Sequence, residues 1–191
     1  RQMIENGNLS SFILWGPPGV GKTTLARIIA HELERPFYTL SAVTSGVKEV
    51  REVIDKAKRY AAMNSGLFGS RESGIGNRES GFERAILFID EIHRFSKSQQ
   101  DSLLGAVEDG TITLIGATTE NPSFEVITPL LSRCQVYVLK SLDKEDLLEL
   151  LNRALNEDEY IRNLNIEVKQ TESILRYSGG DARKLLNIIE L

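Results

Sequence analysis

The chain is 191 residues long, enough for one domain or for a large and a small subdomain. Its 23 lysines and arginines against 27 aspartates and glutamates give a net charge of -4, which excludes a histone-like polycation, so any nucleic-acid contact must come from a local basic face. The single cysteine, Cys134, excludes an intrachain disulfide framework and favours a reducing compartment. No apolar run reaches the roughly 18 residues of a membrane span, and we do not expect a secretory leader, since the first residues lack an apolar h-region. We expect a cytoplasmic protein without membrane partners, and we expect the chain to be a fragment.

The first part of the chain predicts a strand, a glycine-rich loop and a helix. Residues 11–15 (SFILW) form the continuous apolar run that is typical of a buried parallel strand. Residues 16–21 (GPPGVG) break regular structure, and residues 22–34 carry apolar side chains at helical spacing. This order is the outline of a phosphate-binding unit.

A second strand is predicted at residues 36–40 and a long amphipathic helix at residues 47–63. Residues 66–82 then contain a tandem near-repeat, GSRESG followed by GNRESG, which is rich in glycine and serine. Such a segment buries too little apolar surface to offset the entropy of ordering it, so we expect a mobile surface loop. Contacts of Arg71, Arg78 and the following Arg84 with nucleic-acid phosphates are the less favoured interpretation of its charges.

The middle of the chain alternates strands with short helices. Residues 85–89 (AILFI) predict a buried strand, and Ser96 with Gln99 predicts a capping box for a helix that runs to about residue 107. Residues 111–117 (TITLIGA) predict another strong strand. The pair Asn121-Pro122 breaks the chain before a short helix at residues 129–132 and a further strand at residues 135–139.

Beyond residue 140 the pattern becomes helical, with predicted helices at residues 143–155 and 171–177 and a last helix capped by Asp181. The expected fold class is therefore α/β, a parallel sheet flanked by helices, followed by a small all-helical part. We predict the boundary near residue 141, with a nucleotide-binding core at residues 1–140 and an incomplete helical lid at residues 141–191.

Residues 16–23 (GPPGVGKT) match the phosphate-loop pattern G-x-x-x-x-G-K-[ST] in full. Glycines let successive backbone N–H groups point inward at phosphate oxygens, and the following helix adds its dipole. Lys22 is predicted to reach the β- and γ-phosphates, and the Thr23 hydroxyl to ligate Mg²⁺. The predicted nucleotide-binding residues are Gly16, Pro17, Pro18, Gly19, Val20, Gly21, Lys22, Thr23 and Thr24.

Two carboxylates follow the strand at residues 85–89. We predict that Asp90 holds Mg²⁺ together with Thr23 and that Glu91 polarises the attacking water. An acidic pair at this place favours hydrolysis over kinase-like transfer. The competing interpretation is a pair of solvated carboxylates that cap the next helix. The nearby His93 is a base, a sensor or, more often in such positions, a packed residue at a helix start.

Three further sites stay open on chemistry alone. Thr118 and Thr119 end a predicted strand, where a hydroxyl either touches the γ-phosphate or the lytic water, or belongs to an ordinary turn. Arg133 is either a solvated side chain or an arginine finger for the ATP of a neighbouring subunit. Arg183, near the start of the last helix, is unfavourable for the helix dipole, and a nucleotide phosphate is one candidate for its partner.

The motifs GPPGVGKT, ILFIDEIHRF, LIGATTENPSF, LLSRC and GGDAR, in this order, resemble the AAA+ P-loop ATPases and, within them, the clamp-loader clade. The run from Phe88 to Val126 resembles most specifically the family of replication-associated recombination protein A, also called maintenance of genome stability A, and its Werner-helicase-interacting ATPase relatives. The resemblance covers nearly the whole chain except residues 66–82.

The resemblance implies roles for individual residues. Thr118 matches sensor 1, with Thr119 as a less favoured holder of that role, Arg133 matches the finger that acts in trans, and Arg183 matches sensor 2 on the lid. With Glu91 and Lys22 these make up the expected catalytic set. The resemblance also implies ATP and Mg²⁺ as ligands, DNA-dependent ATPase activity at stalled forks, gaps and duplex ends, assembly into homo-oligomers, and association with single-strand-binding protein and the replisome. The family's adenine-packing segment and oligomerisation domain are expected outside this chain.

Three alternatives remain from the sequence. A sliding-clamp-loader subunit shares the SRC motif, and a Holliday-junction branch-migration motor shares IDEIHR. The third alternative is an adaptor that binds nucleotide and hydrolyses little, against which the presence of Glu91, Thr118 and Arg133 argues.

Overall fold

The computed structural model describes residues 9–42, 45–67, 84–163, 166 and 168–190. The chain forms two compact units. The first comprises the residues up to Trp15 together with Thr23–Tyr137, and the second combines Gly16–Lys22 with Val138–Leu191. The phosphate loop is thus grouped with the helical part of the chain. The domain boundary expected near residue 141 stays a prediction.

A five-stranded sheet with the order β2-β3-β4-β1-β5 forms the centre of the first unit. Its strands are β1 (Phe12–Trp15), β2 (Phe37–Ser41), β3 (Ala85–Asp90), β4 (Ile112–Thr118) and β5 (Gln135–Val138). The pairs β2–β3, β3–β4 and β1–β4 are parallel. Every residue of β4 is buried, and β3 is buried up to its last residue. The prediction of a buried parallel sheet is confirmed.

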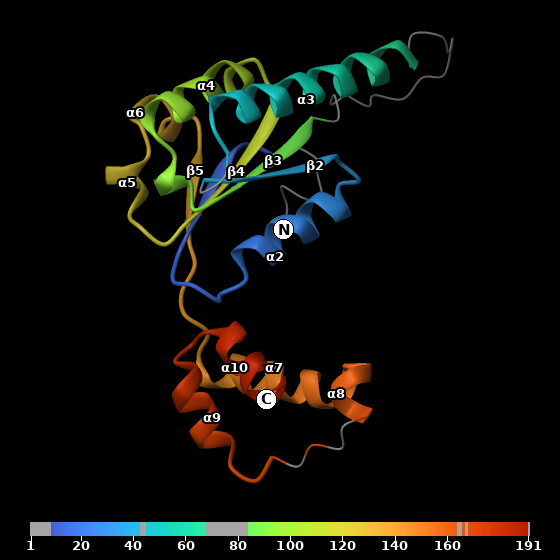
Figure 1. Ribbon diagram of the computed structural model, residues 1–191, viewed down its shortest axis with the longest axis vertical. Coiled ribbons are helices and arrows are strands. Elements are labelled where there is room, and N and C mark those ends of the chain that lie inside the picture. Colours follow the sequence, from blue (N-terminus) through green and yellow to red (C-terminus); the bar gives the residue numbers. More distant parts are fainter. Residues whose placement is uncertain (1–8, 43–44, 68–83, 164–165, 167, 191) are drawn as a thin grey trace, which may run out of the picture. The chain divides into compact units, whose positions relative to one another are not determined.

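Helices cover both faces of this sheet (Figure 1). Helix α2 (Lys22–Glu32) lies on one face, and α3 (Val47–Leu67), α4 (Lys97–Glu108) and α6 (Thr128–Leu131) lie on the other. Alternate side chains of β3 pack on opposite faces of the sheet, because successive side chains of a strand point in opposite directions. Leu87 and Ile89 join the core formed with α3 and α4, whereas Phe88 stacks on the ring of Phe37.

Some boundaries differ from those expected. Helix α3 continues to Leu67, so the first two residues of the expected loop are helical, while residues 68–83 lie outside the described residues. The expected break at Asn121-Pro122 is instead the start of a helical turn, α5 (Pro122–Glu125), because the Asn121 side chain accepts the Ser123 N–H and proline fits the first position of a helix.

The second unit has its own small core. It contains α7 (Lys144–Glu157), α8 (Glu159–Asn163), which the sequence did not predict, α9 (Thr171–Ser178) and α10 (Ala182–Glu190). Leu147, Leu151, Leu175 and Leu185 bring α7, α9 and α10 together. In the described part of the chain, no helix is long and apolar enough to cross a bilayer.

The C-terminal end of α2 contains a strained residue. Arg35 N–H donates to the Ala30 carbonyl and Glu34 N–H to that of His31, the paired bonds of a Schellman cap. Glu34 therefore has a left-handed backbone with φ 51°, a conformation that favours glycine.

We expect Glu34→Gly to raise the free energy of unfolding by about 0.5–1 kcal/mol, since it relieves this strain. Glu32→Gly, at the last residue of the same helix, should lower it by up to about 1 kcal/mol. Urea unfolding of both variants measures the difference. Destabilisation of both variants to the same extent would contradict the prediction.

Cys134 is partly buried against the core of the first unit, and this burial raises the pKa of its thiol to about 11. An unfolded thiol titrates near pH 8.5. Stabilisation from keeping the thiol neutral is therefore complete below about pH 8.5 and is lost as the pH rises toward 11.

At about pH 8 we expect iodoacetamide to alkylate Cys134 on the order of 100-fold more slowly in the folded chain than in urea, because the thiolate is the reactive form. Mass spectrometry of timed samples gives the rate. A folded rate within a few-fold of the unfolded rate would show that the thiol is accessible and ionised.

Candidate nucleotide-binding site

The phosphate loop has the backbone that its sequence requires. Gly19 and Gly21 have φ values of 73° and 87°, which side-chain-bearing residues rarely adopt. The loop follows directly after β1 and leads into α2. The Lys22 ammonium is buried and donates to the carbonyl oxygens of Gly16 and Pro17, both at 2.8 Å. The loop is thus wrapped around its lysine, with a helix N-terminus behind it.

Within the second unit, the phosphate loop contacts the start of α10. The Ala182 N–H donates to the Gly19 carbonyl at 3.1 Å. A Cβ placed on Gly19 would clash with Oδ1 of Asp181. The same oxygen accepts the backbone N–H of Arg183 at 2.8 Å, so Asp181 caps α10 as predicted. This acidic side chain therefore lies directly against the loop.

The predicted carboxylates lie at the end of β3. Asp90 is the last residue of the strand and accepts the Glu91 N–H at 3.1 Å. Glu91 precedes a short 3-10 helix, η1 (Ile92–Arg94), and has a left-handed backbone with φ 53° and ψ 47°. This conformation costs a glutamate about 1 kcal/mol or more, and it occurs beside the other predicted site residues at the ends of β3 and β4.

Thr118, the last residue of β4, is fully buried and bonded on several sides. Its Oγ1 accepts the Glu120 N–H at 3.0 Å, lies 3.1 Å from the Glu120 carbonyl oxygen, and lies 3.0 Å from Nδ1 of His93. The other ring nitrogen of His93, Nε2, lies 3.2 Å from Oε2 of Glu91. The structure therefore brings together Glu91, His93 and Thr118.

Arg133 lies directly after α6 and folds back onto its own unit. Its guanidinium pairs with Glu108 at the end of α4, 2.6 Å away, and donates to the Pro129 carbonyl oxygen at 2.6 Å. Both charged side chains are more than one-third exposed. Such a surface pair contributes only about 0–1 kcal/mol, so it can be exchanged for another partner.

The remaining predicted residues lie at the surface or are half-buried. Arg183 is exposed on the first turn of α10, Thr24 is exposed on α2, and Thr119 is half-buried just past the end of β4. Thr23 is half-buried in the first turn of α2.

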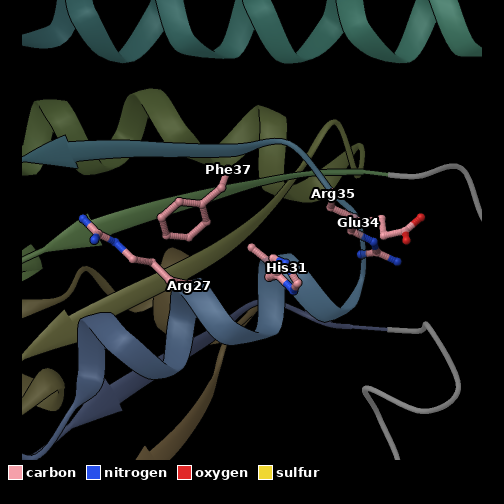
Figure 2. Close-up of a pocket in the computed structure, with 6 residues that line it drawn as sticks. Arg27, His31, Glu34, Arg35 and Phe37 are labelled. Carbon is pink, nitrogen blue, oxygen red and sulfur yellow. The ribbon is translucent and has the colours of Figure 1, made fainter. Parts of the chain in front are cut away.

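A separate open pocket of about 390 Å³ lies between the C-terminal half of α2 and the start of β2 (Figure 2). Its lining consists of Arg27, Ala30, His31, Glu34, Arg35 and Phe37. None of these residues belongs to the predicted nucleotide site. Arg27 and His31 project from α2, and Glu34 and Arg35 lie in the connection between α2 and β2 (Figure 2).

Sequence reasoning missed several residues that contact the predicted site residues or the segments next to them. Asp181 was expected to cap a helix, but its contact with the phosphate loop was not foreseen. Glu108 and Glu120 were not singled out. Nor was Gln100, which is 1% exposed and bonds the carbonyls of Phe95 and Glu125 and the N–H of Ile127. Gln100 lies one helical turn before Leu103, on the apolar face of the predicted helix, and this spacing could have predicted that it is buried.

The profile of the family "ATPase family associated with various cellular activities (AAA)" matches residues 12–142. The chain belongs to the AAA ATPase family. The match contains the phosphate loop, the two carboxylates, Thr118 and Arg133. The expected AAA-type fold and the expected ATPase class are therefore confirmed.

Individual proteins give a more specific similarity than the family profile does. The chain is 47% identical over 191 residues to replication-associated recombination protein A of Escherichia coli K12, covering 98% of this chain and 39% of that protein. It is 45% identical to ATPase WRNIP1 of Dictyostelium discoideum, covering all of this chain and 20% of that protein. The chain thus spans about two-fifths or less of these relatives. These similarities confirm the resemblance stated from the motifs.

Among solved structures, the chain is similar to the Thermotoga maritima RuvB Holliday junction branch migration motor, with a TM-score of 0.68 and 29% identity over 99% of this chain and 56% of that one. A mutant of the same Thermotoga maritima RuvB gives a TM-score of 0.71 and 28% identity with the same coverage.

The two constraints on Gly19 predict a strong effect of Gly19→Ala. A methyl group there meets both a positive φ and the Asp181 carboxylate, so we expect the loop to distort and the affinity for ATP to fall roughly 10-fold or more. Titration with a fluorescent ATP analogue measures the affinity.

Gly179→Ala is the matched control. Gly179 also has a positive φ of 58°, but no atom lies within 4 Å of an added Cβ. We expect this variant to lose about 1 kcal/mol of stability and to keep its affinity for ATP. An equal loss of affinity in both variants would show that backbone strain alone, and not the contact with Asp181, explains the effect.

Proposed function

We propose that this chain is the core of a Mg²⁺-dependent ATPase that acts on DNA at stalled replication forks, gaps and duplex ends. The observation that carries the proposal is the phosphate loop around Lys22 combined with an acidic pair at the end of β3. The DNA part rests on the likeness to proteins named for replication-associated recombination.

Each residue has a proposed part in hydrolysis. Lys22 and the loop N–H groups bind the ATP phosphates, and Glu91 orients and polarises the attacking water. Thr118 senses the γ-phosphate through its hydroxyl. Arg183 contacts phosphate from the helical part of the chain. Most of the rate acceleration comes from positioning and charge stabilisation, since phosphoryl transfer needs little covalent help.

The residues present fit Mg²⁺. Among the described residues, no group of three or more His, Cys, Asp or Glu side chains is arranged to hold a metal. Nucleotide-bound Mg²⁺ needs only one or two protein oxygens, because phosphates and water supply the rest. Thr23 and Asp90 would hold it, and it would neutralise charge on the phosphates.

We further propose that Arg133 acts in trans, on ATP bound by a neighbouring copy, in a homo-oligomer. Its present partner is an exposed carboxylate, and exchanging that pair for a phosphate costs little. Fingers of this kind raise the rate roughly 10³- to 10⁵-fold. Association with single-strand-binding protein and the replisome is the most distant part of the proposal and rests on the resemblance to this family.

A branch-migration motor is the second candidate, because the chain is similar to the RuvB structures over 99% of its length. Strand exchange on a four-way junction would favour it. ATP-dependent binding to a sliding-clamp ring would favour a clamp-loader subunit instead. Stimulation by gapped or single-stranded DNA without either activity supports the proposal.

ATP turnover measured against protein concentration tests the proposed site. We expect specific activity to rise with concentration and with gapped DNA, because the finger comes from a neighbour. Arg133→Ala should lower the rate roughly 10³-fold or more. Glu91→Gln should bind ATP normally and lose nearly all turnover, because it keeps the shape and removes the base.

Glu108→Gln is the control, since it removes the present partner of Arg133 and leaves the proposed finger intact. It should keep or raise the activity. A specific activity independent of concentration, with Arg133→Ala unimpaired, would refute action in trans. Unchanged turnover in Glu91→Gln would remove Glu91 from the mechanism and revive the nucleotide-binding adaptor.

A further inference from the structure

His93 connects two residues that the proposed mechanism uses separately. Its ring is nearly enclosed, with 12% of the side chain exposed, and both nitrogens have a partner. Nδ1 lies 3.0 Å from the Thr118 hydroxyl, and Nε2 lies 3.2 Å from the Glu91 carboxylate. A histidine that merely fills space at a helix start would need neither contact.

The direction of the bond to Glu91 follows from the chemistry of the groups. An ionised carboxylate only accepts hydrogen bonds, so Nε2 must carry a hydrogen and donate it to Oε2 of Glu91. This holds whether the ring is neutral or charged. The other partner near this oxygen, Nε of Arg94, is 3.9 Å away on a side chain that is 61% exposed, and it constrains the carboxylate weakly.

The Thr118 hydroxyl has one hydrogen and two possible acceptors. Its oxygen already accepts the Glu120 N–H. With a neutral ring whose hydrogen is on Nε2, Nδ1 is an acceptor, and the hydroxyl hydrogen goes either to the Glu120 carbonyl or to Nδ1 of His93. Anything else that takes this hydrogen removes it from Nδ1. The hydroxyl hydrogen therefore has two alternative acceptors, one of which is the ring that bonds Glu91.

We propose that His93 is a positioning residue that couples Thr118 to Glu91, so that contact of the Thr118 hydroxyl with phosphate changes how the Glu91 carboxylate is held. This inference rests on the roles proposed above for Thr118 and Glu91. The ring orients the carboxylate and does not touch the reacting atoms.

The surrounding fold holds the ring in place. Ile92, which precedes His93, is fully buried, and its side chain occupies the space left open by Gly116 in β4. A Cβ on Gly116 would lie 3.1 Å from Cδ1 of Ile92. The left-handed backbone of Glu91 turns the chain from β3 into η1 and brings its carboxylate back to the ring.

Nitrogen-15 NMR of the histidine rings tests the contacts without nucleotide. The chain has two histidines, and His31 lies on the exposed face of α2, so His31→Gln assigns the spectrum. We expect Glu91→Gln to shift Nε2 of His93 and Thr118→Val to shift Nδ1, with His31 unmoved in both. Unchanged His93 signals in both variants would overturn the inference.

Two replacements of His93 separate its two bonds. Asparagine retains a polar atom near the position of Nδ1 and loses the bond to Glu91, whereas glutamine can place an amide N–H near the position of Nε2. We expect His93→Asn to lower kcat roughly 10- to 100-fold with little change in KM for ATP, and His93→Gln to retain more of the rate. Arg94→Ala, the matched control, should stay within about 2-fold of wild type.

The double variant of His93→Asn with Thr118→Val should be no slower than the slower single variant, because both changes break one chain of contacts. Additive losses, or a kcat of His93→Asn equal to wild type, would overturn the positioning role. If the wild-type chain neither binds nor hydrolyses ATP at any concentration, the proposed function fails, and the ring-nitrogen shifts still decide whether His93 joins Glu91 and Thr118.

Discussion

Parallel pairing of β1, β4 and β3 is the constraint on which the site depends. Parallel strands end at the same edge of a sheet, and ligands of such sheets bind outside that edge. Trp15, the residue before the phosphate loop, pairs with Thr118, and Ile89, the residue before Asp90, pairs with Gly116. A slip of one residue in either pair would turn the wrong side chains toward the core. The buried registers of β3 and β4 therefore determine where the chemical groups lie.

The polar groups at this edge are costly unless they bond to one another. A buried hydroxyl without a partner loses about 1–3 kcal/mol, and a left-handed glutamate about 1 kcal/mol or more. Thr118 avoids the first cost through Glu120 and His93, and Glu91 offsets the second with the bonds of its own carboxylate. The contacts that offset these energetic costs also hold the carboxylate of Glu91, the proposed base, in one orientation. Stability of the fold and positioning of Glu91 therefore depend on the same contacts.

Much of this arrangement could be predicted from the sequence because it depends on local patterns. Continuous apolar runs specify the strands, the Ser96–Gln99 box gives the start of α4, and GPPGVGKT specifies the loop. Contacts between distant segments could not be predicted. The link from His93 to Thr118 spans 25 residues, and Asp181 meets Gly19 only because the chain returns to the loop. Local structure can be predicted where the sequence pattern is strong. Contacts between distant segments depend on how the whole chain packs, which the pattern does not contain.

The charged groups of the site differ in how firmly they are held, and this difference is consistent with their proposed tasks. Lys22 is buried and donates to two carbonyl oxygens of its own loop, and it would lose both hydrogen bonds if it moved away. Arg133 forms an exposed pair that water and salt readily screen, as a group that must exchange partners requires. If the arginine formed a buried ion pair instead, its movement would leave the partner carboxylate buried and unpaired, which costs several kcal/mol. With the exchangeable cation at the surface and the fixed cation in the loop, the arrangement is consistent with the proposal that one copy binds phosphate through Lys22 while another supplies or withdraws Arg133.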